Sequence, residues 1–304
     1  MRAIVATDQS AGVQGLRLTE IDHPHAAEND VVVEVHAAGF TRGELTWPGT
    51  WTDRAGRDRT PSVPGHEVAG VVAELGYGTS GLTVGQRVYG LADWTRNGTL
   101  AEYVAVEARN LAPLPISVDF TTAAAVPISG LTAWEALFDH ARLQVGQTVL
   151  VHGAGGGVGA LAVQLAHHAG ARVIGTGRAA DRDTVLDLGA DAFVDLQNDQ
   201  LGDAGPADVV LDVIGGDTYR RSLDVLRPGG CIVTVPEPPP VRPENGRAIF
   251  FVVEVDRGRL AELASRVGAG TLNPVIGAVR PLDEAIDAFA PAVRVKGRTI
   301  IKVR

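Results

Sequence analysis

The chain has 304 residues, 45% of them hydrophobic and 21% charged, which is typical of a globular protein large enough for two domains. Its formal net charge of −9, without any basic stripe, argues against a nucleic-acid partner. The single cysteine, Cys231, excludes an internal disulfide framework and a cysteine-rich zinc site. No hydrophobic signal core and no run of about 18 apolar residues is present, so we expect a cytoplasmic protein without membrane contact.

Short strand-like runs, separated by Gly, Pro, Asn and Asp, fill the first 120 residues and predict a β-rich domain. The predicted strands are residues 2–6, 16–20, 30–37, 67–74, 86–90, 100–106 and 110–113. Residues 46–62 are predicted to form one long polar loop that holds Trp47 and Trp51. A loop of this length covers a substrate or is a flexible surface excursion, and the sequence leaves both interpretations open.

From residue 121 the pattern changes to alternating helices and apolar strands, which predicts a doubly wound parallel α/β sheet. The predicted helices are residues 121–126, 130–137, 158–169, 181–188 and 217–226. The predicted strands are residues 148–151, 171–176, 192–196, 208–214, 231–235 and 249–255. In such a sheet the ligand binds at the carboxyl ends of the strands.

A glycine-rich turn, Gly153 to Gly159, joins the first of these strands to the helix after it. Glycines allow a tight turn and a close approach to a pyrophosphate, whose charge the N–H groups of the helix's first turn bind. The alternative, a turn that only lets the helix pack, is disfavoured because strand, glycine turn and helix follow in the required order. The sequence therefore predicts a dinucleotide site.

The residues after the second strand favour NADPH over NAD. An NAD site usually places an acid about 20 residues beyond the glycines, to bind the ribose 2′-hydroxyl. Here Thr176, Gly177 and Arg178 occupy that window, and the first acid is Asp181. Arg178 can pair with a 2′-phosphate and Thr176 can donate a hydrogen bond to it. The alternative for Arg178 is a solvated surface charge.

Residues 259–267 and 282–289 are predicted as helices and residues 299–303 as a closing strand. We expect this segment to rejoin the N-terminal domain. The predicted division is residues 1–120 for the β-rich catalytic domain, 121–255 for the dinucleotide-binding domain, and 256–304 for the returning segment.

Five motifs together resemble one known family. They are residues 64–72 (PGHEVAGVV), 98–104 (GTLAEYV), 130–134 (GLTAW), 152–159 (HGAGGGVG) and 296–301 (KGRTII). They are similar to the medium-chain dehydrogenases/reductases, in the zinc-free quinone oxidoreductase-like branch that includes NADPH:quinone reductase and zeta-crystallin. The resemblance implies a GroES-like β-rich domain packed against a Rossmann domain, with the active site in the cleft between them.

The chain departs from the zinc enzymes of this family at the metal ligands. Those enzymes bind catalytic zinc through a cysteine, a histidine and a second cysteine or acid. Here only His66 matches, and Thr41 and about Ile128 stand at the other two positions. Because a catalytic zinc needs about three protein ligands, we expect no metal, and we expect His66 and Glu67 to be structural.

The resemblance then implies hydride transfer from NADPH to a small electrophilic acceptor, either a quinone or an enone or enal. The substrate-pocket candidates are Thr41, Glu44, Trp47 and Trp94, with no assigned catalytic group. The cofactor-binding candidates are Thr132, Gly155, Gly156, Gly157, Val158, Thr176, Gly177, Arg178, Val213, Thr234, Phe250, Phe251 and Val252. The strand that contains Phe250 to Val252 also implies a homodimer.

The sequence leaves the proton donor open, and it also leaves open two alternative functions. The proton that accompanies hydride can come from Tyr89, Tyr103, Glu44 or water. A carbonyl or alcohol dehydrogenase that uses Thr41 and His66 in place of zinc is the second enzyme hypothesis. A noncatalytic NADPH-binding sensor is the hypothesis from another class of protein.

Overall fold

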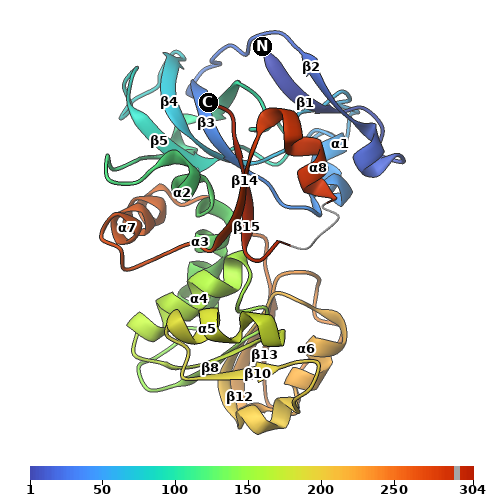
Figure 1. Ribbon diagram of the computed structural model, residues 1–304, viewed down its shortest axis with the longest axis vertical. Coiled ribbons are helices and arrows are strands. Elements are labelled where there is room, and N and C mark those ends of the chain that lie inside the picture. The colour runs from blue at the N-terminus through green and yellow to red at the C-terminus, as the bar shows by residue number, and fades with distance from the viewer. Residues whose placement is uncertain (291–294) are drawn as a thin grey trace. The chain divides into compact units, whose positions relative to one another are not determined.

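The computed structural model describes residues 1–290 and 295–304, which divide into two compact units (Figure 1). The first unit comprises Met1–Pro127, Val255–Thr271 and Ile276–Arg304. The second comprises Ile128–Glu254 and the short segment Leu272–Val275. The chain therefore leaves the first unit after Pro127, and its later segments return to it.

The first unit is rich in β-structure. In the described part of the chain, seven strands form one sheet, in the order β14-β15-β3-β4-β5-β7, with β6 paired to β3. Their bounds are β3 (Asp30–Gly39), β4 (Glu67–Leu75), β5 (Arg87–Leu91), β6 (Tyr103–Glu107), β7 (Leu111–Pro113), β14 (Ile276–Pro281) and β15 (Arg298–Lys302). The strands β1 (Arg2–Ala6) and β2 (Leu16–Glu20) form a separate antiparallel pair. Val31, Val33 and Val35 are fully buried and join a core shared with β1, β4 and β5, and Val32 between them is fully buried as well.

Short helices complete this unit, and one of them, together with one strand, differs from prediction. Their bounds are α1 (Pro48–Trp51), α2 (Phe120–Ala124), α7 (Arg257–Gly268) and α8 (Ala285–Phe289). The prediction of one long polar loop over residues 46–62 is wrong, because Pro48 begins a helical turn and Trp51 is 5% exposed. The strand β14 was not predicted. Its alternate residues are only half-buried, and Gly277 and Pro281 lack any strand preference.

The second unit is a parallel sheet with the order β10-β9-β8-β11-β12-β13 within the described residues. The strands are β8 (Thr148–Val151), β9 (Arg172–Gly177), β10 (Ala192–Asp195), β11 (Ala207–Asp212), β12 (Leu226–Thr234) and β13 (Gly246–Phe250). Numbered from β8, this is the order 3-2-1-4-5-6 of a Rossmann sheet, with its switch point between β8 and β11. The predicted doubly wound fold is confirmed.

The helices of this unit are α3 (Pro127–Trp134), α4 (Gly157–His168), α5 (Arg182–Asp187) and α6 (Gly216–Ser222), and a π-helical turn, Glu135–His140, continues α3. The predicted strand over residues 249–255 is wrong beyond Phe250. Phe250 pairs with Thr234, the last residue of β12, so the chain after it has no partner strand. Phe251 and Val252 therefore lie outside the sheet. Among the described residues, no helix is both long and apolar enough to cross a membrane.

Candidate active site

The glycine turn has the geometry that a dinucleotide site requires. After β8 the chain turns at Gly153, whose φ is +63°, and α4 begins at Gly157 with Gly156 as its N-cap. A Cβ atom at Gly159 would lie 2.2 Å from the carbonyl oxygen of Gly153, so only glycine allows this close packing. The first N–H groups of α4 have no acceptor within the helix, and they form the positive end of its dipole. The residues of this turn therefore fit the pyrophosphate of a dinucleotide.

The end of β9 lies beside this turn. The N–H of Ala154 donates to the carbonyl oxygen of Thr176 at 2.9 Å. Past the strand end, Arg178 is exposed. Its backbone N–H donates to Oδ2 of Asp181 at 3.3 Å.

Asp181 is the residue of this region that the sequence reasoning missed. A Cβ atom at Gly155 would lie 2.8 Å from Cγ of Asp181, and one at Gly177 would lie 3.2 Å from its Oδ2. The carboxylate thus contacts two of the cofactor-binding candidates. The rule that an acid lies about 20 residues beyond the glycines could have identified it, because a count from Gly159, the last glycine of the turn, leads to Asp181.

The hydroxyl of Thr176 does not lie on the surface of this site. It is fully buried and lies 2.8 Å from Nδ1 of His152, whose Nε2 lies 2.7 Å from Oγ of Ser222. Ser222 donates its own proton to the carbonyl oxygen of Thr218, so it accepts from Nε2 of His152, and Nδ1 accepts from Thr176. The interpretation of this hydroxyl as a donor to a 2′-phosphate is therefore wrong.

His152 is neutral in this network. Complete burial lowers its pKa from 6.5 to about 4, although the charge of Asp212 acts in the opposite direction. The network ties β8, β9 and α6 together directly behind the glycine turn.

The loop after β11 is held by a buried carboxylate. Asp212 accepts from the N–H groups of Ile214 and Gly215, both at 2.9 Å, and from the hydroxyl of Thr234 at 3.0 Å. Val213 reaches the glycine turn, since a Cβ atom at Gly153 would lie 2.8 Å from its Cγ2. Thr234 is thus a buried support of the loop, and Val213 is half-buried beside the turn.

The remaining cofactor candidates differ in exposure. Thr132, in α3, is 5% exposed. Phe250 and Val252 are exposed, and Phe251 is half-buried with its ring 4.6 Å from that of His140.

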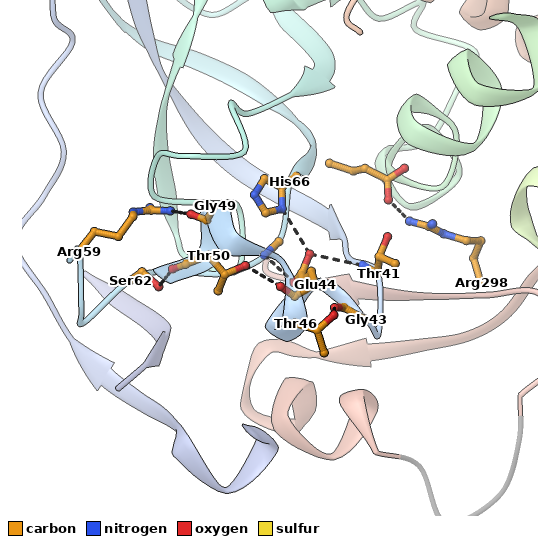
Figure 2. A network of polar contacts seen from close by, with 12 residues as sticks. Thr41, Gly43, Glu44, Thr46, Gly49, Thr50, Arg59, Ser62, His66 and Arg298 are labelled. Atoms are coloured by element: carbon orange, nitrogen blue, oxygen red, sulfur yellow. Dashed lines mark hydrogen bonds and ion pairs between the residues drawn. The ribbon is translucent and has the colours of Figure 1, made fainter. Parts of the chain in front are cut away.

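In the first unit, two of the substrate-pocket candidates, Thr41 and Glu44, lie close to His66 (Figure 2). Glu44 is completely buried. Its Oε1 accepts from the N–H of Gly65 at 2.8 Å, and its Oε2 lies 3.2 Å from Nδ1 of His66 and 3.5 Å from the nitrogen of Thr41. The ring centroids of Trp94 and Trp47 lie 4.9 and 5.9 Å from that of His66. The sequence analysis named Thr41, Glu44, Trp47 and Trp94 as pocket candidates, but it gave His66 a functional role only in the dehydrogenase alternative.

Local hydrogen bonds explain how Glu44 is held. The hydroxyl of Thr50, in α1, donates to the carbonyl oxygen of Glu44 at 2.6 Å, and Nε1 of Trp51 donates to that of Leu45 at 2.8 Å. The helix α1 therefore fixes the 3-10 turn that carries Glu44, while His66 directly precedes β4.

A second buried charge pair lies in the same unit. The carboxylate of Glu67 contacts the guanidinium of Arg298, at the start of β15. Burial lowers the pKa of Arg298 to about 10, and the charge of Glu44 opposes that shift. A Cβ atom at Gly39 would lie 2.5 Å from Oε2 of Glu67, so the glycine leaves room for the pair.

The two tyrosines considered as proton donors are occupied elsewhere. Tyr89 is 1% exposed and donates to the carbonyl oxygen of Leu260, and burial raises its pKa. Tyr103 donates to Glu34 at 3.3 Å and accepts from Arg304 at 3.1 Å. Neither hydroxyl has a hydrogen bond to Glu44 or His66.

Comparison with known proteins places the chain in a family. Residues 27–116 match the model of the alcohol dehydrogenase GroES-like domain, and residues 157–244 match that of the zinc-binding dehydrogenases. The quinone oxidoreductase of Rattus norvegicus is 30% identical over 321 residues, which cover 98% of this chain and 95% of that protein. The chain belongs to the medium-chain dehydrogenase/reductase superfamily.

Other members of the superfamily are similar along most of the chain. The chloroplastic NADPH-dependent alkenal/one oxidoreductase of Arabidopsis thaliana is 32% identical over 95% of this chain and 76% of its own length. The structure of the quinone oxidoreductase from Coxiella burnetii superposes with a TM-score of 0.91 at 29% identity, covering 100% of this chain and 99% of that one. The spectinabilin polyketide synthase system protein NorB of Streptomyces orinoci is 38% identical over 69% of this chain, which spans only 10% of that protein.

The zinc that one family description implies does not fit the residues present. At the positions where the resemblance implies the other two ligands, Thr41 and about Ile128 offer no thiolate, imidazole or carboxylate, so His66 would be a single ligand where about three are needed. Over residues 1–290 and 295–304, no group of three or more His, Cys, Asp or Glu side chains could hold a metal ion.

Proposed function

We propose that this oxidoreductase uses NADPH to reduce a quinone or an α,β-unsaturated carbonyl compound without zinc. The observation that carries the proposal is the combination of an intact dinucleotide turn at Gly153 to Gly159 with Thr41 and Ile128 at the metal-ligand positions. A bound nicotinamide supplies the hydride. The chain's own residues bind the cofactor, orient the acceptor and provide for its proton.

The similar proteins support this class of reaction. Relatives at about 30% identity are named quinone oxidoreductases, and one is named an NADPH-dependent alkenal/one oxidoreductase. Quinones, enones and enals share the unit O=C–C=C, which accepts hydride at carbon and a proton at oxygen. An acceptor of this kind needs no Lewis acid of the strength that alcohol oxidation requires.

The proposed preference for NADPH depends on Arg178 and Gly177. Gly177 places no side chain at the end of β9, and Arg178 is exposed there. A guanidinium pairs well with a phosphate. Asp181 opposes this preference, because its carboxylate lies beside both residues. We therefore propose a preference for NADPH that this carboxylate moderates.

The test starts with chelator-treated protein, which is titrated with NADPH and then NADH while energy transfer from tryptophan to nicotinamide is followed. A quinone and a simple enal are then added to the saturated complex. Oxidation of bound NADPH by either acceptor supports the proposal. Failure of both cofactors to bind would refute it. Turnover of an alcohol with NADP⁺, and of neither acceptor, would instead favour the dehydrogenase alternative.

We also propose a cytoplasmic homodimer. β13 is an edge strand of its sheet, and Phe250 and Val252 are exposed beside it, 38% and 64% respectively. An unpaired edge with exposed apolar side chains is suited to pairing with a second copy. Light scattering of the wild type and of a Val252→Lys variant tests this, because a dimer built on this edge should dissociate in the variant.

A further inference from the structure

We propose that His66, positioned by Glu44 and enclosed by Trp47 and Trp94, binds the carbonyl oxygen of a planar quinone and donates a proton to it. This inference rests on the proposed function, and it names both the acceptor class and the proton donor. His66 would then be a catalytic residue, and Glu44 a positioning residue.

The first observation is an unsatisfied atom. His66 is 2% exposed, and its Nε2 is buried without a hydrogen-bond partner in the described part of the chain. Buried polar side-chain atoms almost always have a partner, so this nitrogen requires an explanation. A carbonyl oxygen at Nε2 supplies one when the ring is protonated, because both ring nitrogens are then donors.

The second observation is how the ring is held. An ionised carboxylate only accepts hydrogen bonds, so Nδ1 of His66 carries the proton in its contact with Glu44. The other oxygen of Glu44 is fixed by the N–H of Gly65, so the carboxylate cannot turn away. This arrangement leaves Nε2 as the functional atom: a lone pair in the neutral ring and a donor in the protonated one. The nearby Glu67–Arg298 pair completes the charged surroundings, since Arg298 interacts electrostatically with Glu44.

The third observation is the aromatic surface around this atom. Trp47 and Trp94 meet edge to face, with centroids 5.4 Å apart and an interplanar angle of 86°, and both are half-buried. Two indole rings with one polar nitrogen beside them match a flat ring that carries a carbonyl oxygen. An open-chain enal has no ring to stack on them. Because His66 is almost inaccessible, side chains around it must move aside for the oxygen to reach Nε2.

The proton balance closes with these groups. Hydride adds to the β-carbon of the O=C–C=C unit, the π electrons shift to oxygen, and that oxygen takes the proton from Nε2. The imidazolium becomes a neutral imidazole, and water returns a proton to it. The enol product tautomerises to the hydroquinone, so the quinone gains two electrons and two protons.

The test uses the full chain without cofactor and 2-methyl-1,4-naphthoquinone as the probe. Binding is followed by tryptophan quenching in the wild type, in His66→Gln and in His25→Gln, a matched control at an exposed histidine. We expect His66→Gln to weaken quinone binding about tenfold. We expect NADPH binding to stay unchanged, and His25→Gln to behave as the wild type.

Turnover gives the second arm. His66→Gln should lower kcat for the quinone roughly a hundredfold or more. Glu44→Gln should lower kcat for the quinone more than it raises KM, while NADPH binding is retained. Trp94→Leu should weaken the binding of the quinone more than the binding of a simple enal. Equal losses for the two acceptors would overturn the assignment to a planar acceptor.

A readout on the wild type keeps the inference testable if the buried variants do not fold. The ¹⁵N signals of His66 can be assigned through proton contacts to the Trp94 ring, and quinone binding should shift Nε2 and not Nδ1. An unmoved Nε2 signal, or an unchanged quinone affinity in folded His66→Gln, would overturn the inference. If NADPH binds and quinone is reduced in that case, the proposed function survives. If the wild type binds no NADPH, the proposed function itself fails.

Discussion

His152 provides a quantitative test of the second unit. The imidazole is completely buried, with Thr176 on one nitrogen and Ser222 on the other, and its pKa is about 4 in the folded state against 6.5 ordinarily. The unfolded chain therefore binds a proton at a higher pH than the folded chain. The contribution of the neutral His152 to the free energy of unfolding is therefore fully present above pH 6.5, and it is lost as the pH falls towards 4.

The magnitude follows from the size of the shift. Each pKa unit corresponds to about 1.4 kcal/mol, so the wild type should lose about 3 kcal/mol of unfolding free energy between pH 7 and pH 4 through this residue. That is a large part of the few kcal/mol that usually separate folded from unfolded states. His152→Gln keeps a polar side chain but cannot titrate.

The assay is urea denaturation followed by far-UV circular dichroism from pH 7.5 to pH 4. The two compact units can unfold in separate steps, and the step that His152→Gln alters reports the second unit. At pH 7 the His152→Gln variant should itself have a lower free energy of unfolding than the wild type, because glutamine fits the hydroxyls of Thr176 and Ser222 less well. The measured quantity is the difference in unfolding free energy between wild type and variant at each pH. Carboxylates that titrate in both proteins cancel in this difference.

An exposed histidine of the same unit serves as the control. His168→Gln, at the end of α4, should leave the pH dependence of the wild type unchanged. If wild type and His152→Gln lost stability in parallel from pH 7 to pH 4, the histidine would be protonated at no cost. The account of a neutral, desolvated imidazole would then be wrong.

Three further changes test the cofactor turn. Gly159→Ala should lower the free energy of unfolding by about 1–3 kcal/mol and weaken the binding of NADPH and NADH alike, because the new Cβ would meet the carbonyl oxygen of Gly153. Full affinity in a stable variant would contradict the turn geometry. Arg178→Ala should weaken NADPH about tenfold and NADH little, as measured by energy-transfer titration, and equal weakening would show that it does not contact a 2′-phosphate. Asp181→Asn should raise the affinity for NADPH relative to NADH about fivefold, because about 1 kcal/mol of repulsion between the carboxylate and the 2′-phosphate is lost. Asp183→Asn, at an exposed neighbour, should change neither affinity.

The sequence was sufficient for the architecture of the second unit because that architecture is encoded locally. Apolar strands alternate with helical segments, and the glycine turn marks the first βα junction, so the parallel sheet follows from the pattern. The direction of individual side chains was not encoded in this way. β9 is buried on both faces, and its composition does not show that Thr176 points towards His152.

The centre of the first unit could not be predicted for a related reason. His66 and Glu44 are brought together only by the tertiary fold, and the helix α1, which holds the turn of Glu44, was interpreted as loop. A histidine that lacks its usual metal partners was taken as structural. Only the three-dimensional structure shows that Nε2 is left without a hydrogen-bond partner among residues 1–290 and 295–304.

The place of β15 in the first sheet has a consequence for synthesis of the chain. β15 pairs with the last residues of β3, Ala37 to Gly39, although the two strands lie at opposite ends of the sequence. On a ribosome, the whole second unit emerges before β15, a delay on the order of tens of seconds. Throughout that interval the carboxyl half of β3 has an open backbone edge, the kind of surface on which nascent chains aggregate. The unit that contains β3 therefore closes only after the second unit has been made, and a chain truncated before β15 would leave that edge open permanently.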